Sequence, residues 1–513
     1  SSSFEYFPGI PIHHSKDLVN WELVGYALHR PEQVRGPVNL MDVQQDGGIQ
    51  AATIRYHNGT FYVITTSVYQ GINSKEGNCT NFIVTATDPR GPWSLPHVLE
   101  GADGIDSSLL FDGDRVWYTG THSPATPDYL GEGEIWLQEV DLNTWSLIGP
   151  ISYLYRGACG GVWTEGPHLY KRDGRYYLIT AEGGTGYHHA VMAAVADKIT
   201  GPYVSNPRNP ILTTRHLSYN NWVTRVGHAD FVELPDGRWY VVALGVRSDI
   251  GQRSNMGRES FLIPMVWERE PDEYQPQYLW PVVAPETGTV ERNLPLPLSA
   301  AQQQPARFRD DFSGAKLGLE WNFRRLPLDG AFNLWANPGH LRLFARPETI
   351  SLEQRSRPSM LGVRQIESDF AFRAQMAFKP EADGIAAGLV LWQKDDIYIL
   401  YTLTREGGVW ALSVLSVPRG APPTYLGQAK LTDYKGDITL EVNSTREGYQ
   451  FTYSLGASSG QPVHVGQAST EALVYMGYTG AYLGLYCSSQ GQRAQREEFA
   501  DFDWVERVSA VRL

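Results

Sequence analysis

Four segments of the sequence repeat one pattern, a strand, a tight Asn-Gly or Asp-Gly type turn, and a second strand rich in Tyr, Trp and Val. Between them recurs a second piece, in which a turn led by Asp or Gly-Pro precedes an aromatic residue and an outgoing strand. Each unit is therefore two hairpins, with no helical pattern between units. Such units predict a β-propeller, whose blades pack around a central channel. The four hairpin segments are IQAATIRYHNGTFYVIT (49–65), IDSSLLFDGDRVWYTGT (105–121), TEGPHLYKRDGRYYLIT (164–180) and GHADFVELPDGRWYVVA (227–243).

The number of repeats predicts the number of blades. The chain opens with a second-hairpin piece, residues 16–25, that has no first hairpin before it. Four hairpin segments and this partial unit predict a five-bladed propeller over residues 1–290, with the first blade lacking its inner hairpin.

The composition and the strand pattern of the sequence change after Val283. Residues 291–306 are rich in Pro and Gln without periodicity, which predicts a linker. Residues 307–513 contain short alternating strands separated by turns, as in a β-sandwich. The predicted fold is all-β, a five-bladed β-propeller followed by a jelly-roll-like β-sandwich domain.

Four polar residues fall at one position of the repeat when the hairpins are aligned on their turn glycines. Gln50, Glu165 and His228 precede their glycines by the same interval, and Asp106 joins them if its hairpin is two residues shorter. In a propeller the first strand of each blade lines the channel, so these positions form a ring at one mouth. Each residue alone has an ordinary explanation, a solvated carboxylate or a core histidine. Together they predict a functional site.

The charge of the chain narrows the class of ligand. The formal net charge is -13 and no block of Lys and Arg occurs, which argues against nucleic acid and anionic membranes as partners. Aromatic residues make up 12% of the chain, and no apolar run approaches the ~20 residues of a membrane span. These features favour a soluble protein with a neutral ligand.

Two carboxylates that converge on a pocket for a neutral ligand indicate glycoside hydrolysis. One carboxylic acid protonates the leaving oxygen while a second group assists attack at the anomeric carbon. Apolar walls would raise the pKa of the acid into the range that this role requires. No cofactor is required for this chemistry. The rival use of Asp, Glu and His is metal binding, for which the sequence would allow a structural calcium ion near His228.

The first 285 residues resemble the glycoside hydrolases of family 43, and among them the two-domain β-xylosidases and α-L-arabinofuranosidases. The resemblance rests on FEYFPGIPIHHSKDLVNWELVG, TEGPHLYKRDGRYYLITAEGGT, VGHADFVELPDGRWYVVALGVR and GRESFLIPMVWE. It implies that Glu165 is the general acid and that Asp106 tunes its pKa and orients the substrate. It further implies that His228 and Arg247 hold the sugar or the channel centre, and that Phe7 is an aromatic wall of the sugar site.

Two departures from the family pattern affect the prediction. In the family the general base is an Asp in a DPS motif before the FEYFPG stretch, and the given sequence starts after that point, so no residue is named as the base. Asp17 and Asp42 are rejected, because Asp17 leads an outer-hairpin turn and Asp42 lies in a connection. Gln50 stands where many family β-xylosidases carry a stacking Trp, which favours dual activity on xylosides and arabinofuranosides.

The resemblance extends to the second domain through SMLGVRQ and YTGAYLGLY. In the related enzymes this domain lends an aromatic loop to the pocket rim, for which Tyr478 or Tyr482 is the candidate, with Tyr482 preferred. The alternative is a carbohydrate-binding module with its own aromatic platform.

The function predicted from the sequence is an exo-acting, inverting hydrolase that releases terminal xylose or arabinofuranose from xylo-oligosaccharides or arabinoxylan. A non-catalytic sugar-binding propeller and a strict α-L-arabinofuranosidase remain the alternatives. Three scattered cysteines allow one disulfide at most. Sequons at Asn58, Asn78 and Asn443 favour a secreted glycoprotein.

Overall fold

The computed structural model describes residues 2–72, 74, 77–158, 160–248, 254–269, 277–295, 307–351, 353–456, 461–474, 478–492 and 497–509. Within these ranges the helical segments are two short 3-10 turns, η1 (Pro31–Gln33) and η2 (Thr470–Leu473), and all other regular structure is β. No helix among the described residues has the length and apolarity needed to cross a membrane. The all-β prediction is confirmed, while Cys159 and most of the predicted linker lie outside the described residues.

Five antiparallel sheets follow one another along the chain up to Val283. The first has only two strands, the outer hairpin that the sequence predicts. In chain order the sheets contain β2 (Gly9–His14) and β3 (Glu22–Leu28); β4 (Gly48–Ile49), β5 (Thr53–His57), β6 (Thr60–Gln70), β7 (Gly77–Ala86) and β8 (His97–Val98); β9 (Ile105–Asp112), β10 (Arg115–His122), β11 (Glu134–Asp141) and β12 (Ser146–Tyr155); β13 (Glu165–Arg172), β14 (Arg175–Glu182), β15 (Ala190–Ala196), β16 (Val204–Ser205) and β17 (Leu212–Thr213); β18 (Val223–Glu233), β19 (Trp239–Arg247), β20 (Glu259–Arg269) and β21 (Leu279–Val283).

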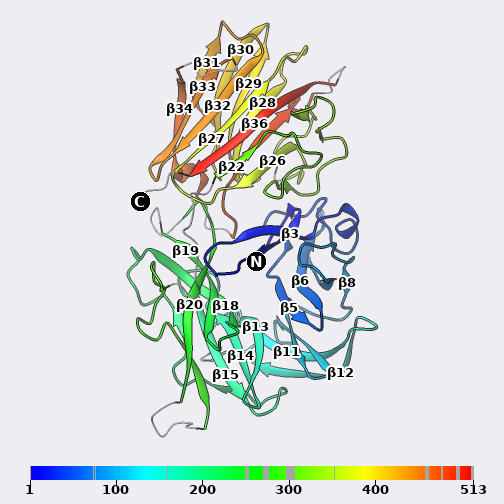
Figure 1. Ribbon diagram of the computed structural model, residues 1–513, viewed down its shortest axis with the longest axis vertical. Helices are drawn as coiled ribbons and strands as arrows, with labels where there is room; N and C mark the ends of the chain where they lie inside the picture. Colours follow the sequence, from blue (N-terminus) through cyan, green and yellow to red (C-terminus); the bar gives the residue numbers. More distant parts are fainter. Residues whose placement is uncertain are drawn as a thin grey trace.

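The first strands of these sheets face a common centre. Figure 1 shows β5, β13 and β18 around the middle of the lower part of the molecule, with β12, β15 and β20 farther out. Three of the inner strands carry a β-bulge, at Asp106 in β9, after Glu165 in β13 and around His228 in β18. A bulge changes the direction of one side chain without ending the strand. Polar residues of the repeat can therefore turn into the channel.

Two further sheets form a sandwich beyond Arg307, which confirms the predicted second architecture. Their inner faces share a core in which, for example, the rings of Tyr401 and Phe451 are 5.3 Å apart. One sheet has the order β24 (Phe332–Asn333), β25 (Leu341–Phe344), β36 (Phe499–Ser509), β27 (Phe370–Ala377), β32 (Asp437–Ser444), β33 (Gly448–Leu455) and β34 (Val463–Ser469), with β22 (Arg307–Asp310) also on β36. The other has the order β26 (Ser359–Arg364), β35 (Tyr482–Ser488), β28 (Ala386–Lys394), β29 (Ile397–Glu406), β30 (Val409–Val417) and β31 (Thr424–Leu431).

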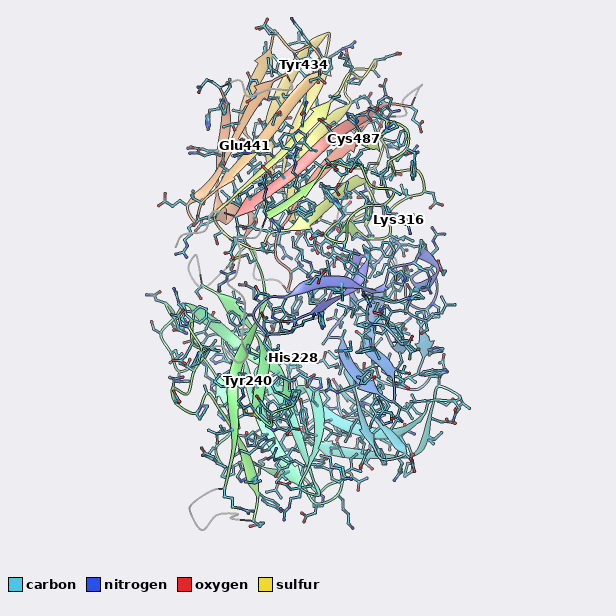
Figure 2. The ribbon with its side chains drawn as sticks, viewed as in Figure 1. His228, Tyr240, Lys316, Tyr434, Glu441 and Cys487 are labelled. Atoms are coloured by element: carbon cyan, nitrogen blue, oxygen red, sulfur yellow. The ribbon has the colours of Figure 1, made fainter. Side chains whose placement is uncertain are left out.

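The two parts of the molecule are joined by shared structure. β1 (Tyr6–Phe7) pairs with β23 (Phe323–Arg324), so the start of the chain bonds to the second part. One hydrophobic core runs from β2 and β3 into the sandwich without interruption. Figure 2 shows the two parts stacked, with His228 in the lower part and Cys487 and Glu441 in the upper.

A network of buried charges crosses this junction. Arg324 Nη2 lies 2.9 Å from Glu5 Oε1, and Arg324 Nε lies 2.5 Å from Asp395 Oδ1. Arg325 Nη2 lies 2.7 Å from Asp395 Oδ2. All four side chains are buried, so each charge depends on its partners for stabilisation.

Candidate active site

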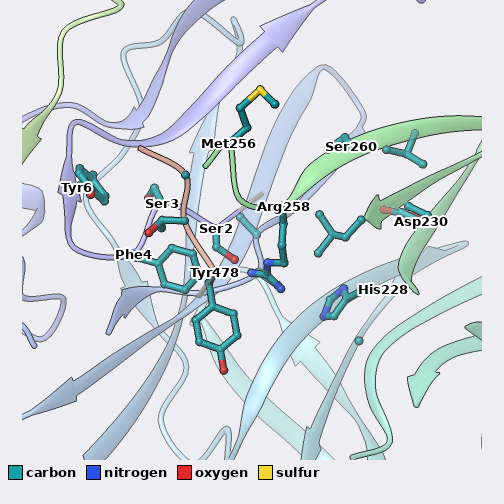
Figure 3. A pocket seen from close by; sticks show the side chains of 18 of the residues that line it. Ser2, Ser3, Phe4, Tyr6, His228, Asp230, Met256, Arg258, Ser260 and Tyr478 are labelled. Carbon is teal, nitrogen blue, oxygen red and sulfur yellow. The ribbon is translucent and has the colours of Figure 1, made fainter. Parts of the chain in front are cut away.

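A cavity of about 250 Å³ lies at the mouth of the channel, where the bulged inner strands meet the second part of the chain. Figure 3 shows its wall, with Arg258 between His228 on one side and Phe4 and Tyr478 on the other. The lining side chains come from the N-terminal segment, the inner strands, the approach to β20 and the segment 478–482. Those with aromatic or titratable groups are Phe4, Tyr6, Asp106, His168, His228, Asp230, Arg258, Arg364, Tyr478 and Tyr482.

Asp106 and His228 form an ion pair at the cavity wall. His228 Nε2 lies 3.1 Å from Asp106 Oδ2, which also accepts a hydrogen bond from the Gly166 N–H at 3.1 Å. Both residues have positive φ, 57° and 47°, in accord with their places at bulges. Gly166 has φ 60°, and a Cβ there would stand 2.9 Å from the His228 ring, so this contact requires glycine.

The pair is charged because each member stabilises the other. Burial alone would raise the pKa of Asp106, but His228 and the Gly166 N–H lower it below its usual value. Burial alone would lower the pKa of His228, and the carboxylate of Asp106 raises it instead. Asp106 is therefore the ionised carboxylate of the site.

The pKa of Glu165 is shifted in the direction opposite to that of Asp106. It begins β13, one residue before the cavity-lining Gly166, and its side chain is half-buried. Burial and then the negative charge of Asp106 raise the pKa of Glu165 to about 7, against the opposing charges of His228 and Arg258. A carboxylic acid that keeps its proton near neutral pH can protonate a leaving group. The two carboxylates therefore differ in charge, as an acid and its electrostatic partner must.

Arg258 and two aromatic rings make the wall opposite His228. The rings of Phe4 and Tyr478 are stacked with centroids 5.6 Å apart. The Arg258 guanidinium lies 4.9 Å from the centre of the Tyr478 ring and 6.0 Å from that of Phe4. Burial lowers the pKa of Arg258, although Tyr478 and the nearby carboxylates oppose this. The wall offers flat apolar faces and a cationic hydrogen-bond donor, which suit a sugar ring and its hydroxyl groups.

Arg55 crosses the channel beneath the cavity. Its guanidinium, from β5, lies 2.8 Å and 3.2 Å from the two carboxylate oxygens of Asp230 on β18. It also lies 3.2 Å from His168 Nδ1 on β13, and Tyr170 OH donates to Asp230 at 2.5 Å. This network bonds three inner strands together and neutralises the charge of Asp230.

The residues around His228 do not fit a calcium ion. Calcium takes six to eight oxygen ligands. The carboxylates that line the cavity are already engaged, Asp106 with His228 and Asp230 with Arg55 and Tyr170. No group of three or more His, Cys, Asp or Glu side chains in the described part of the chain is arranged to hold a metal ion. The Arg55 guanidinium supplies positive charge at the channel centre.

Phe7 was wrongly predicted as the aromatic wall. It is buried in the core and pairs through β1 with Phe323. Phe4, three residues earlier in the same motif, lines the cavity and stacks on Tyr478. Its carbonyl and N–H are bonded to Ile49, which holds this segment at the mouth.

Gln50 and Arg247 were also wrongly placed in the pocket. The side-chain amide of Gln50 donates to the Asp46 carbonyl at 3.1 Å, and Ala51 and Ala52 line the cavity instead. The reason is that this inner strand is interrupted between β4 and β5, and Gln50 lies in the interruption, where its amide turns back to Asp46. Arg247 forms a two-bond pair with Glu259 outside the cavity.

Tyr482 and Tyr478 occupy different ends of the cavity. Tyr482 lines it but is buried, stacked on Tyr6 at 4.3 Å and on Trp392 at 5.1 Å, and its hydroxyl accepts from Arg364 Nε. Tyr478 is 41% exposed and faces Arg258. The aromatic residue that the second part contributes to the rim is therefore Tyr478, the candidate that was ranked second.

Sequence reasoning missed five residues of the site, Phe4, Arg55, His168, Asp230 and Arg258. Asp230 is two residues after His228 in the same strand. Because alternate residues of a strand share a face, this spacing could have identified it. His168 and Arg55 lie on the inner strands of the same repeat. Phe4 and Arg258 lie outside the repeat, but both belong to segments that carry the family resemblance, FEYFPG and GRESFLIPMVWE.

Comparisons with known proteins show which family the chain belongs to. Residues 1–271 match the family model described as glycosyl hydrolases family 43, and residues 309–507 match the model of a beta xylosidase C-terminal concanavalin A-like domain. A xylosidase/arabinosidase of Butyrivibrio fibrisolvens is 36% identical over 520 residues, covering 99% of this chain and 94% of the relative. A non-reducing end alpha-L-arabinofuranosidase of Bacteroides ovatus is 35% identical, covering 99% and 89%.

Solved structures resemble the chain over nearly its whole length. A GH43B protein from a Bacteroides ovatus xyloglucan locus has a TM-score of 0.86 and 33% identity, covering 99% of this chain and 95% of that one. A xylan beta-1,4-xylosidase from Bacillus halodurans has a TM-score of 0.87 and 29% identity, with the same coverage. Glu165 and Asp106 thus lie in a fold that these structures share over nearly the whole chain. The protein belongs to glycosyl hydrolases family 43 and is a glycosidase.

Proposed function

We propose that the protein removes single xylose or arabinofuranose units from the ends of xylan-derived chains, with inversion of anomeric configuration. The observation that carries this proposal is the pairing of Glu165, with a pKa of about 7, and ionised Asp106 beside one small cavity. The names of the relatives, xylosidase/arabinosidase and alpha-L-arabinofuranosidase, support a pentose as the unit released.

The size of the cavity supports release of one unit at a time. Its volume of about 250 Å³ is below the ~300 to 1,000 Å³ of most ligand pockets, so it suits one sugar ring. Phe4 and Tyr478 would lie against the ring, and Arg258 would donate to its hydroxyl groups. The chain end enters, and the rest of the substrate stays outside.

In the proposed reaction Glu165 donates its proton to the glycosidic oxygen as the bond from that oxygen to the anomeric carbon breaks. Asp106 keeps the proton on Glu165 until that moment, because its negative charge opposes ionisation of the acid. A water molecule attacks the anomeric carbon from the opposite face and loses a proton to a general base.

Neither Asp106 nor Asp230 is assigned as that base. Asp106 is held by His228, and Asp230 by Arg55 and Tyr170. Burial alone would raise the pKa of Asp230, but Arg55 lowers it well below its usual range.

Proton NMR of freshly formed product tests the proposal. Hydrolysis of a β-xyloside should release α-xylose first, which then mutarotates. Initial release of β-xylose would show retention and contradict the mechanism, while no turnover of xylosides or arabinofuranosides would contradict the substrate class.

A non-catalytic sugar-binding propeller is distinguished by adding azide. Azide attacks the anomeric carbon without a general base, while Glu165 still protonates the leaving oxygen. Formation of a pentosyl azide therefore requires the acid and the sugar site alone. Pentose binding without pentosyl azide or free pentose would favour the non-catalytic alternative.

We also propose that the protein is secreted. Two of its three sequon asparagines, Asn58 and Asn78, are exposed, so both can accept a glycan. A mass decrease after endoglycosidase treatment of the protein from its natural source tests this, and an unchanged mass would contradict it.

A further inference from the structure

The acid restricts where the departing part of the substrate can lie. Glu165 must touch the glycosidic oxygen, and the first sugar of the leaving chain is bonded to that oxygen. The leaving sugar therefore lies beside Glu165, which is next to the cavity-lining Gly166. Any side chain that binds this sugar must stand at the rim close to the start of β13.

Trp163, two residues before Glu165, is held at that place. Its N–H donates to the Gly131 carbonyl at 2.6 Å, and the carbonyl of Val162 accepts from the Gly183 N–H at 2.8 Å. The indole lies in a slot between two glycines. A Cβ at Gly131 would come within 3.1 Å of the indole nitrogen, and one at Gly184 within 2.8 Å of Cε3.

The slot leaves much of the indole uncovered. Trp163 is 54% exposed although its backbone is bonded on both sides. An aromatic side chain that is already fixed loses little conformational freedom when a ligand covers it. Trp163 therefore offers a flat and rigid surface for a sugar ring.

The same loop that forms the slot reaches the cavity wall. Thr185, the neighbour of Gly184, accepts a hydrogen bond from Arg258 Nη1 at 3.3 Å. Arg258 lines the cavity and its charge acts on Glu165. This contact places the loop, and the indole packed on it, at the mouth of the cavity.

The adjoining rim is also apolar. Leu130, next to Gly131, is 96% exposed. Tyr219 is 55% exposed, and its ring packs at a tilt against Tyr187 of the same loop as Gly184, with centroids 4.4 Å apart. Exposed apolar surface around one opening of a chain with net charge -13 suits a neutral ligand with apolar ring faces.

We infer that Trp163 is the leaving-group subsite, where its indole stacks on the pyranose ring of the first sugar beyond the cleaved bond. The inference deepens the proposed function and rests on it. Trp163 acts on binding of the leaving sugar, and the ring in the cavity does not touch it. A change at Trp163 should therefore alter the affinity for substrates that have a sugar on the leaving side, and not the affinity for those that lack one.

Calorimetric titration with xylose and with β-1,4-xylobiose tests this, in a Glu165→Gln background that prevents hydrolysis. Trp163→Ala should weaken xylobiose binding by about tenfold, the scale of one stacked ring, and leave xylose binding unchanged within about twofold. Trp163→Phe keeps an aromatic face and should lose less affinity for xylobiose.

Trp21 supplies a matched control, because it is also a tryptophan and also 54% exposed. It lies in the connection between β2 and β3, none of whose residues lines the cavity. Trp21→Ala should leave both dissociation constants unchanged. An unchanged ratio of the two constants in Trp163→Ala, with or without an equal loss for both sugars, would overturn the inference. Failure of every variant to bind xylose would instead overturn the assignment of xylose in the proposed function.

Discussion

The proton on Glu165 depends on three charged neighbours of unequal effect. Asp106 raises the pKa of the acid, while His228 and Arg258 lower it, and burial sets the direction of the whole shift. At a pKa of about 7 the acid is protonated below neutral pH and loses its proton above it. We therefore expect kcat/KM to fall as the pH rises through about 7.

Replacing Glu165 with Gln should abolish protonation of the leaving oxygen and keep the shape of the side chain. We expect kcat/KM for xylobiose to fall by about 10²- to 10⁴-fold, because its alkoxide leaving group requires the proton. A dinitrophenyl xyloside, whose leaving group is stable as an anion, should lose about tenfold or less. Initial-rate kinetics on both substrates measure the difference.

Glu233→Gln is the control, since this exposed carboxylate ends β18 away from the cavity. It should leave both rates unchanged. Equal losses on both substrates in Glu165→Gln would show that this residue is not the acid.

Replacing Asp106 with Asn removes the charge that holds the proton on Glu165. Burial still raises the pKa of Glu165, but the repulsion from Asp106 is gone, so this pKa falls. The alkaline limb of the profile of kcat/KM against pH should move to lower pH, by about one unit. An alkaline limb at unchanged pH would show that Asp106 does not act through the pKa of Glu165 and that its role is to position His228 and Gly166.

Individual site residues were predictable where the repeat carried them. Asp106, Glu165 and His228 share one repeat position, and the bulges at that position bring them together. Gln50 has the same position but lies at a strand break, which the spacing of turn glycines does not reveal. Phe7 was chosen over Phe4 because the motif holds two phenylalanines and only packing distinguishes them.

At the scale of elements, the segment 478–482 is docked by backbone contacts onto the residues before β20. Gly257 and Thr479 form a β-bridge, and the Ala481 N–H donates to the Asn255 carbonyl at 2.6 Å. Gly480 permits this approach, because a Cβ there would lie 2.3 Å from the Met256 carbonyl oxygen. The docking places Tyr478 over Arg258.

Gly480→Ala should push these two segments apart and move Tyr478 from Arg258. We expect xylose binding to weaken by about tenfold, the scale of one lost pocket contact. Titration calorimetry of the variant measures it, with thermal unfolding to check that the fold is kept.

Gly36→Ala is the control, since a Cβ at Gly36 meets no atom within 4 Å. Its affinity for xylose should match that of the unchanged protein. Unchanged affinity in Gly480→Ala would mean that the close approach of the two segments does not matter to the pocket.

Hairpins were predictable from the sequence because their turn residues and alternation are local signals. The docking of residues 478–482 on the approach to β20 was not, since it joins two segments far apart in the chain through backbone contacts. No side-chain pattern marks such contacts. The preference for Tyr482 over Tyr478 failed for the same reason.

At the scale of the whole molecule, the two parts share a core and a buried network of charges. Removing one member of a buried ion pair leaves the other charge without compensation. The two parts should therefore lose stability together and unfold in one transition.

Arg325→Met should lower the free energy of unfolding by about 3 to 5 kcal/mol, because the buried carboxylates of Glu5 and Asp395 would then share Arg324 and leave one negative charge uncompensated. Urea unfolding monitored by tryptophan fluorescence measures the loss. Arg35 pairs with Asp329 across the same junction but at the exposed surface, so Arg35→Met should have little effect. Equal effects of the two substitutions would contradict a special role of the buried network.

The bonds of Arg55 to Asp230 and His168 join inner strands across the channel beneath the cavity. A polysaccharide chain cannot pass through the channel beyond this network. A released pentose therefore leaves through the opening by which the chain end entered. Each catalytic cycle thus ends with an empty site and a new encounter. In a mixture of long chains, each binding event would remove one unit, so all chains would shorten at similar rates. Free pentose would compete with the chain ends for the cavity.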